Sequence, residues 1–356
     1  MNKSASSFTH GNKYETIQVL RFICALMVMF LHATFYTSER LDSGTFIYYQ
    51  GFNGVKLFFI ISGFVMIISS QNLINDKRGW KIFATKRIIR IVPIYWIITT
   101  YKVLVLIFAS SLVFHARLDI VYILKSYFFI PTVNIDGKIQ PFYAVGWTLN
   151  CEMFFYFLFT IALALRIRPI IFLGSILIPL SILSIFKTAA WPAVGFYTDP
   201  IILNFLYGMI AAQLIISGKK LPQNIAIPLV AILLVFIFLP RNGVFSSYNI
   251  TNNDIVISIA AFLVIYGGAS IENVWSKKIP NILIYLGGAS YSLYLIHPSV
   301  APFAPTLLKK LHLKFDLLSV VFAVIIATLV GVLFYQLCEK PITKFLTKRA
   351  RASNLI

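Results

Sequence analysis

The stretch IQVLRFICALMVMFLHATF (17–35) decides the fold, because its apolar run is long enough to cross a bilayer as a helix. It also holds two ionisable residues, Arg21 and His32, and such residues are costly in hydrocarbon and typically functional there. Eleven steps of about 100° leave the two side chains about 20° apart around the helix and about 16.5 Å apart along its axis. This spacing suits a long ligand with an anionic head at one end and reactive chemistry at the other.

The composition extends this interpretation to the whole chain. Of its 356 residues, 59% are hydrophobic and 12% are charged, whereas soluble domains are about 25% charged. We therefore expect an all-α polytopic membrane protein, because hydrocarbon offers no partners for the backbone of a non-helical segment. The predicted transmembrane helices, about ten in number, cover residues 15–36, 52–70, 88–110, 142–164, 169–187, 200–217, 223–240, 254–271, 281–300 and 317–338. Residues 119–131 are shorter and are expected to lie in the interface or to re-enter the membrane.

The net charge of +19 indicates topology rather than nucleic-acid binding. Lys and Arg lie in short loops between apolar segments, roughly twice as many on one side as on the other. The positive-inside rule places that side, and both termini, in the cytoplasm. A nucleic-acid-binding protein would gather these charges on a soluble face, so we expect no nucleic-acid partner and attraction to anionic membrane lipid instead. The chain then divides into a cytoplasmic segment 1–14, a membrane domain 15–345 and a cytoplasmic basic tail 346–356.

A basic cluster lies in FATKRIIRIVPIYW (83–96), at the start of the third predicted span. Arg87 and Arg90 share one helical face, with Lys86 beside them. Arginine side chains suit bidentate contacts to phosphate, and the N-terminus of a helix adds a favourable dipole. Ordinary positive-inside anchoring explains the same residues, so both interpretations stay open.

An acidic residue, Glu152 in GWTLNCEMFFY (146–156), falls near the middle of the membrane. A lone carboxylate there must be neutral or must face a cation or a cavity. A structural salt bridge to Arg21 or to Lys56, an intramembrane lysine of the second span, is the alternative. The three cysteines lie in apolar spans without paired or metal-type spacing, so no metal site is predicted.

A late segment, LGGASYSLYLIHPSV (286–300), places Ser290, Tyr294 and His297 within roughly 60° of one another on a helix. The predicted orientation puts His297 near the external face, where a helix-end histidine among interfacial aromatic residues is the structural alternative. Glu339 follows at the cytoplasmic end of the last span, where pairing with a neighbouring basic residue is expected.

In this order, the segments resemble the integral-membrane acyltransferase family known as acyltransferase 3, and within it the bacterial exopolysaccharide acetyltransferases. Arg21 and His32 match its Arg–ten residues–His signature. The other matching motifs are GVKLFFIISGFVM, KRIIRIVPIYW, WTLNCEMFFY, SYSLYLIHP and EKP, and the resemblance covers about residues 15–345. Two departures, Lys56 where the family often has an acidic residue and Gly288 where a polar residue is common, imply a repaired charge network or an altered acceptor specificity.

The resemblance implies a membrane O-acyltransferase, most simply an O-acetyltransferase, in the bacterial cytoplasmic (inner) membrane as a multi-pass protein. The donor would be acyl-CoA, most simply acetyl-CoA, as a co-substrate and not a bound cofactor. The acceptor would be a sugar hydroxyl of a cell-surface or exported polysaccharide or of its lipid-linked precursor.

The resemblance and the spacing together suggest a role for each candidate residue. Residues expected to bind the phosphates of acyl-CoA are Arg21, Lys86, Arg87 and Arg90. The thioester would lie near His32, which acts as a general base or carries the acyl group itself, and Glu152 would orient His32 or a basic partner. Residues expected on the acceptor side, or in a structural role, are Trp147, Ser290, Tyr294 and His297.

Two other functions stay open from the residues alone. A secondary transporter for an anionic metabolite needs the same intramembrane Arg, His and Glu. An acyltransferase for a small acceptor other than a polysaccharide needs the same donor site. A non-catalytic scaffold would not need deep ionisable residues, and the nucleotide-binding and nucleophile motifs of soluble enzymes are missing.

Overall fold

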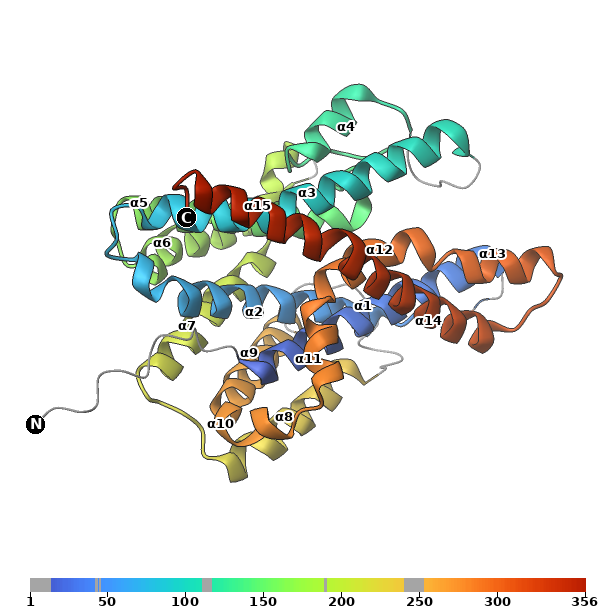
Figure 1. Cartoon of the computed structure of the whole chain (residues 1–356). Helices are drawn as coiled ribbons and strands as arrows, with labels where there is room; N and C mark the ends of the chain where they lie inside the picture. The colour runs from blue at the N-terminus through green and yellow to red at the C-terminus, as the bar shows by residue number, and fades with distance from the viewer. Residues whose placement is uncertain (1–13, 42–43, 45, 111–116, 189–190, 240–252) are drawn as a thin grey trace, which may run out of the picture.

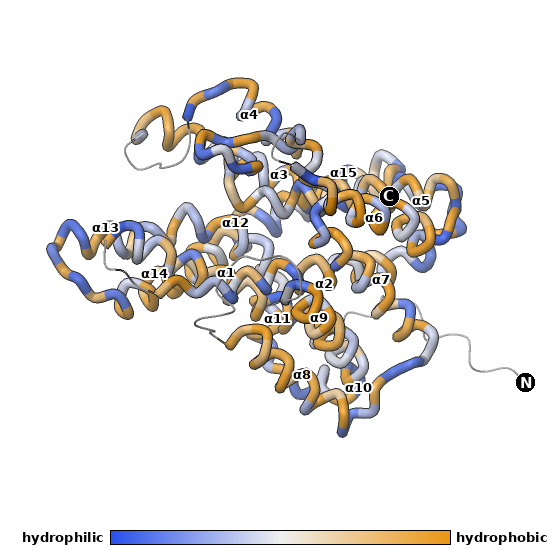
Figure 2. The backbone as a smooth tube through the Cα atoms, turned by 180° about the vertical axis from the view of Figure 1, so that it is seen from behind, coloured by the Kyte–Doolittle hydropathy of each residue, from blue (hydrophilic) through white to orange (hydrophobic). Residues whose placement is uncertain are grey.

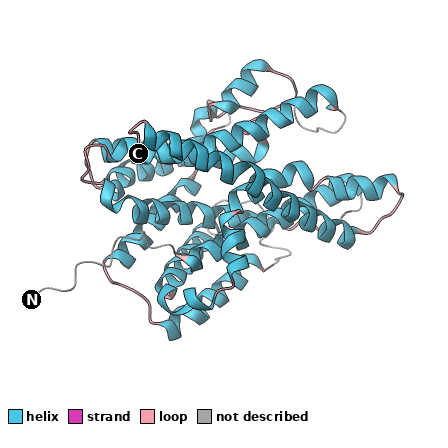
Figure 3. Cartoon of the chain, viewed as in Figure 1, coloured by secondary structure: helices cyan, strands magenta, loops and turns pink. Residues whose placement is uncertain are grey.

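The chain folds into helices throughout the part that the computed structural model describes, residues 14–41, 44, 46–110, 117–188, 191–239 and 253–356. The main helices are α1 (Glu15–Leu41), α2 (Asn53–Ser70), α3 (Gly79–Phe108), α4 (Ile120–Tyr127), α5 (Trp147–Ala164), α6 (Pro169–Leu183), α7 (Leu203–Ile216), α8 (Gln223–Phe238), α9 (Asn253–Ser270), α10 (Glu272–Trp275), α11 (Asn281–Gly288), α12 (Ser290–Val300), α13 (Phe303–Lys310), α14 (Asp316–Phe334) and α15 (Lys340–Ala352). Figures 1 and 3 show these helices joined by short connections. The predicted all-α membrane fold is confirmed. Nearly all of the predicted segment 1–14, with Arg241, lies outside the described residues.

Six helices of the described chain are long and apolar enough to span a membrane. They cover residues 15–41, 49–73, 79–108, 144–164, 169–186 and 316–352. The helices at 200–216 and 223–238 are shorter, and α9 meets the α10 segment at a bend of 54°. The described part of each predicted span is therefore largely helical, while the count of ten transmembrane helices stays a prediction.

One predicted span, 281–300, is not a continuous helix. It breaks at Ala289 into α11 and α12. The break follows Gly287 and Gly288, which favour helix poorly, and α11 presses closely on α1: a Cβ on Gly287 would lie 2.1 Å from the Gln18 carbonyl oxygen. The short segment 119–131 contains α4, which Asp119 caps by accepting a hydrogen bond from the Tyr122 amide at 3.0 Å.

Helix α1 lies in the middle of the molecule, in contact with α2, α9, α11, α12, α13 and α14 (Figure 1). Apolar residues run along the helices, whereas hydrophilic residues gather at the ends and connections (Figure 2). Many large apolar side chains point outward, Phe157, Ile171 and Leu329 among them. This pattern fits a surface that contacts lipid, and it leaves the interior of the bundle for polar groups.

The last helical segment continues beyond the predicted final span. A π-helical turn (Tyr335–Glu339) joins α14 to α15, so helix runs from Asp316 to Ala352. Helix α15 packs against α3. Much of the predicted basic tail, 346–356, is therefore helical rather than irregular.

Helices α2 and α7 pack against each other at very short backbone distances. Gly63 of α2 and Gly208 of α7 allow it, because a Cβ on Gly63 would lie 2.0 Å from the Phe205 carbonyl oxygen. A Cβ on Gly208 would lie 1.9 Å from the carbonyl oxygen of Ile60. The missing side chains let the two backbones touch, as small residues do in other membrane helix pairs.

We expect Gly63→Ala and Gly208→Ala each to lower the thermal unfolding temperature of the detergent-solubilised protein. The added methyl groups meet backbone that cannot move independently, so about 1–3 kcal/mol of stability is lost to overpacking. Gly174→Ala in α6 is the matched control, because its nearest neighbour would lie at 3.9 Å, an ordinary contact. Equal unfolding temperatures for all three variants would contradict the close contact.

Candidate active site

A cavity inside the bundle brings together six of the residues singled out in the sequence. Its walls come from α1, α2, α3, α5 and α12, and with the open space at its mouth it measures about 900 Å³. The predicted residues that line it are Arg21, Arg87, Arg90, Glu152, Ser290 and Tyr294. The structure therefore joins the first, third, fourth and ninth predicted spans at one site.

The cavity has a basic end formed by three arginines. Arg21 donates to the Gln18 side-chain oxygen at 3.1 Å, and the Arg87 guanidinium lies 5.5 Å from the Phe83 ring centroid and 5.8 Å from that of Tyr156. Within the described part of the chain, none of the three arginines forms an ion pair with a carboxylate. Arginines without acidic partners in a membrane interior make a binding site for an anion.

Two buried polar atoms of the cavity residues lack hydrogen-bond partners. They are Nε of Arg87 and Oγ of Ser290. A buried donor left unpaired is costly. Both atoms belong to residues that line the cavity, but the atoms themselves are covered by protein.

Glu152 faces this cavity, where it accepts hydrogen bonds from two neighbours. Ser62 Oγ donates to Glu152 Oε1 at 3.0 Å, and the Tyr156 hydroxyl makes a short hydrogen bond to the same oxygen. Glu152 therefore contacts Ser62 and Tyr156, not His32. Ser62 comes from the middle of α2, and the sequence pattern did not single it out.

His32 instead meets His297, and the two rings form a pair. Nε2 of His297 lies 3.1 Å from Nδ1 of His32, and the ring centroids are 4.8 Å apart. Nδ1 of His32 is also 3.0 Å from the Val28 carbonyl oxygen. His297 is fully buried in α12, so this residue, expected on the acceptor side, belongs with the predicted catalytic histidine.

Tyr294 lies between the cavity and the histidine pair. It lines the cavity, and its ring centroid is 5.8 Å from that of His297. Its hydroxyl is 3.0 Å from Thr148 Oγ1 and donates to the Val145 carbonyl oxygen at 3.2 Å. Because α1 is one continuous helix, Arg21 and His32 share a face about 16.5 Å apart along the axis.

Besides the paired His32 and His297, two more predicted site residues are not among those that line the cavity. Lys86 is exposed on α3, and it is not among the lining residues. Trp147 packs edge-on against Phe59 and Phe196, at ring-centroid distances of 6.4 and 6.3 Å. Their positions fit membrane anchoring for Lys86 and packing for Trp147.

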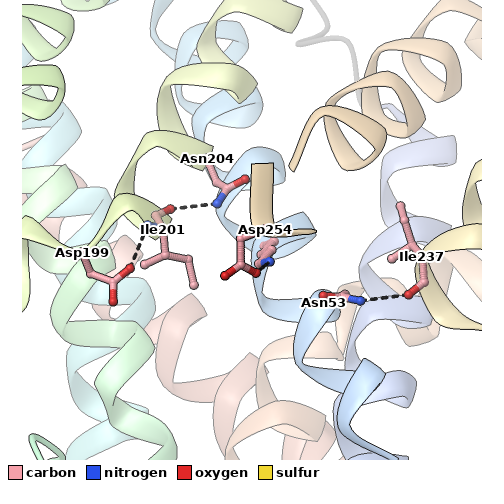
Figure 4. A network of polar contacts seen from close by, with 7 residues as sticks. Asn53, Asp199, Ile201, Asn204, Ile237 and Asp254 are labelled. Atoms are coloured by element: carbon pink, nitrogen blue, oxygen red, sulfur yellow. Dashed lines mark hydrogen bonds and ion pairs between the residues drawn. The ribbon is translucent and has the colours of Figure 1, made fainter. Parts of the chain in front are cut away.

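Lys56 forms an ion pair with Asp254 at the start of α9. Its amine therefore does not pair with Glu152. Figure 4 draws Asp254 together with two other polar residues of the region: Asn204, whose amide donates to the Ile201 carbonyl oxygen at 2.9 Å, and Asn53, whose amide donates to the Ile237 carbonyl oxygen at 2.9 Å. Asp254 thus supplies the negative charge opposite Lys56 from another helix.

Glu339 is buried at the end of the π-helical turn, where it accepts a hydrogen bond from Ser292 of α12. The expected partner was a basic neighbour, and the structure provides a serine hydroxyl instead. This bond ties the last long helix to α12, which also carries the cavity residues Ser290 and Tyr294 and the paired His297.

The apolar helical bundle thus holds a cavity lined by three arginines, beside a pair of histidines. The chain belongs to the acyltransferase 3 family, because the model of that family's acyltransferase domain matches residues 14–336. It is therefore a membrane acyltransferase.

Two curated relatives are similar over most of this chain. The exopolysaccharide production protein ExoZ of Rhizobium meliloti (strain 1021) is 31% identical over 324 residues, which cover 85% of this chain and 91% of ExoZ. The O-acetyltransferase OatA of Staphylococcus aureus (strain NCTC 8325 / PS 47) is 24% identical over 83% of this chain, which spans 53% of OatA. No solved structure matches the chain.

Exchanging the charges of Lys56 and Asp254 tests their pairing. We expect Lys56→Asp and Asp254→Lys each to lower the unfolding temperature, because like charges then face each other, and the double exchange to recover much of the loss. A double-mutant cycle should give a coupling of about 0.5–3 kcal/mol. The exposed pair Arg117–Asp119, 3.6 Å apart, is the control and should couple by about 0–1 kcal/mol. Additive effects at positions 56 and 254 would contradict the pairing.

Proposed function

We propose that this membrane acyltransferase is an O-acyltransferase, most simply an O-acetyltransferase, that uses acyl-CoA as donor. The acceptor is a sugar hydroxyl of an exported or cell-surface polysaccharide or of its lipid-linked precursor. Acyl-CoA as donor is supported mainly by the three cavity arginines, which form no ion pair with a carboxylate of the described chain. A polysaccharide acceptor is supported by the name of one relative, an exopolysaccharide production protein, and an acetyl group by the name of the other, an O-acetyltransferase.

The anionic head of acyl-CoA binds at the basic end of the cavity. Arg87 and Arg90 stand one turn apart on α3, and Arg21 completes the cluster from α1. Guanidinium groups donate to phosphate in a bidentate manner. Glu152 lines the same cavity, but its hydrogen bonds go to Ser62 and Tyr156 rather than to an arginine.

The acyl arm extends past Tyr294 toward the histidine pair. The axial distance of about 16.5 Å from Arg21 to His32 matches the elongated shape of a donor that has its charged head and its thioester at opposite ends. Tyr294 touches both regions. It is therefore placed to contact the acyl arm or the incoming hydroxyl.

His32 acts as the general base of the transfer. It takes the proton of the acceptor hydroxyl while the hydroxyl oxygen bonds to the thioester carbonyl carbon. The carbon–sulfur bond then breaks, and the CoA thiolate leaves and receives the same proton from the imidazolium. The products are a sugar ester and free CoA, and His32 returns to its neutral form.

The donor enters from the cytoplasm in this proposal. The basic end of the cavity lies toward the N-terminal ends of α1 and α3, which run in the same direction in Figure 1. The positive-inside rule assigns these ends to the cytoplasmic side. The protein is then a multi-pass protein of the bacterial inner membrane with both termini inside, and the acceptor approaches from the side of the histidine pair.

Substitutions at the two ends of the donor site should have different kinetic effects. We expect His32→Ala to lower kcat by about 10²- to 10⁴-fold, because a general base is lost. Arg87→Ala should instead raise KM for acetyl-CoA by about 10- to 100-fold, because charge-assisted phosphate contacts are lost. Purified protein with labelled acetyl-CoA and the glycan acceptor gives both constants.

Lys81→Ala is the control, because it removes an exposed charge of α3 away from the cavity, and it should change neither constant. Wild-type transfer by His32→Ala would refute the role of His32.

The proposed identity of the acceptor can be tested in cells that lack the protein. We expect mass spectrometry of their surface and exported glycans to show the loss of one acyl group, restored by the wild-type chain and not by His32→Ala. Membrane vesicles given labelled acetyl-CoA separate this function from transport. Label transferred to glycan supports the enzyme, whereas label accumulated inside without transfer would replace the proposal with a transporter.

A further inference from the structure

The contacts of the histidine pair determine which ring nitrogens carry hydrogen. Nδ1 of His297 lies 3.3 Å from the Leu293 carbonyl oxygen, and a carbonyl can only accept a hydrogen bond. Nδ1 of His297 is therefore the protonated nitrogen of that ring. In a neutral imidazole the other nitrogen then has a free lone pair, so Nε2 of His297 accepts.

The same reasoning applies to His32. Its Nδ1 faces two acceptors, the Val28 carbonyl oxygen at 3.0 Å and Nε2 of His297 at 3.1 Å. Nδ1 of His32 must therefore carry hydrogen, which leaves Nε2 as its basic nitrogen. No carboxylate of the described chain is hydrogen-bonded to either ring. Because a charge without such a partner is costly inside a membrane, we take both rings to be neutral in the resting protein.

We propose that His297 is a positioning residue that holds His32 with Nδ1 protonated and presents Nε2 of His32 as the base for acyl transfer. This inference rests on the proposed function for its chemical use, because it assumes that His32 takes the proton of the acceptor hydroxyl. The pairing of the rings stands independently of that use.

The surroundings of His297 keep it in place. The ring is fully buried, and other residues of α12 are tied to neighbouring helices and loops. Ser292 donates to Glu339, and the Tyr143 hydroxyl donates to the Leu295 carbonyl oxygen and lies 3.0 Å from Ser299 Oγ. Helix α12 is thus fixed on either side of His297, as the support of a catalytic group requires.

The pair also changes what happens when His32 becomes charged. After Nε2 of His32 takes the acceptor proton, its Nδ1–H becomes a charge-assisted donor to Nε2 of His297, and such bonds are roughly twice as strong as neutral ones. The second imidazole therefore stabilises the imidazolium without placing a permanent negative charge in the membrane. A buried carboxylate in the same position would need its own compensation.

Nitrogen NMR of the full chain in lipid nanodiscs, labelled with ¹⁵N-histidine, tests the pairing without any assay of transfer. The chain has five histidines, and the signals of His32 are those lost in His32→Gln. We expect His32 to show a protonated Nδ1 and an unprotonated Nε2, and His297→Leu to move a measurable share of His32 to the other tautomer. A proton on Nε2 in the wild type, or a His32 spectrum unchanged by His297→Leu, would overturn the proposal.

Kinetics of the position-297 variants test the use of the pair. We expect His297→Leu to lower kcat by about 10- to 100-fold, as for other partners that orient a working histidine, and to leave KM for acetyl-CoA unchanged. His297→Gln should recover most of kcat, because its side-chain oxygen replaces Nε2 as acceptor. The control is Thr37→Val, which removes a buried α1–α14 hydrogen bond of 2.8 Å to Ser319 and should leave kcat unchanged. Equal loss in the Leu and Gln variants would overturn the positioning role.

These experiments separate two failures. If His32→Ala retained wild-type transfer, the proposed function of His32 would be wrong, while the NMR result would still decide the pairing. If His32→Ala abolished transfer and His297→Leu left both kcat and the His32 spectrum unchanged, only the role of His297 would be refuted.

Discussion

The structure depends on one constraint: a charged or hydrogen-bonding side chain inside an apolar bundle must face a partner or a cavity. The chain satisfies it in two different ways. Lys56 is paired with Asp254, and Glu339 accepts from Ser292, so these groups hold helices together. Arg87 and its two neighbouring arginines have no acidic partner among the described residues, and they surround a cavity instead. The difference separates groups that serve the fold from groups that serve a ligand.

Much of this arrangement was predictable from the sequence, because apolar length and costly charges are local properties. The spans, and the site character of Arg21, Arg87 and Arg90, follow from residue type and helical spacing, and the structure places these arginines in one cavity. The pairing of Asp254 with Lys56 was not predicted, because a carboxylate at the start of a span is most simply interpreted as a residue at the membrane surface. Only the packing of α2 against α9 shows that it lies opposite Lys56.

The histidines show the limit of sequence reasoning most clearly. His32 and His297 are 265 positions apart, and each alone reads as a deep or helix-end histidine. Their meeting depends on how α12 is rotated against α1, and that depends on the break after α11, on Gly287 and on the bonds that anchor α12. A hydropathy pattern predicts the length of a span but not the rotation of the helix about its axis. Predicting a pair of side chains from two helices therefore requires the packed structure.

The π-helical turn between α14 and α15 has a consequence for how such proteins can diverge. A π turn adds one residue to an α-helix, and here it ends at Glu339, whose carboxylate reaches α12. Deleting one residue in this turn would rotate everything after it by about 100° and turn α15 away from α3. The contact of α15 with α3 therefore depends on this one extra residue, and recombination between relatives at this junction would preserve that contact only where both parents have the π turn.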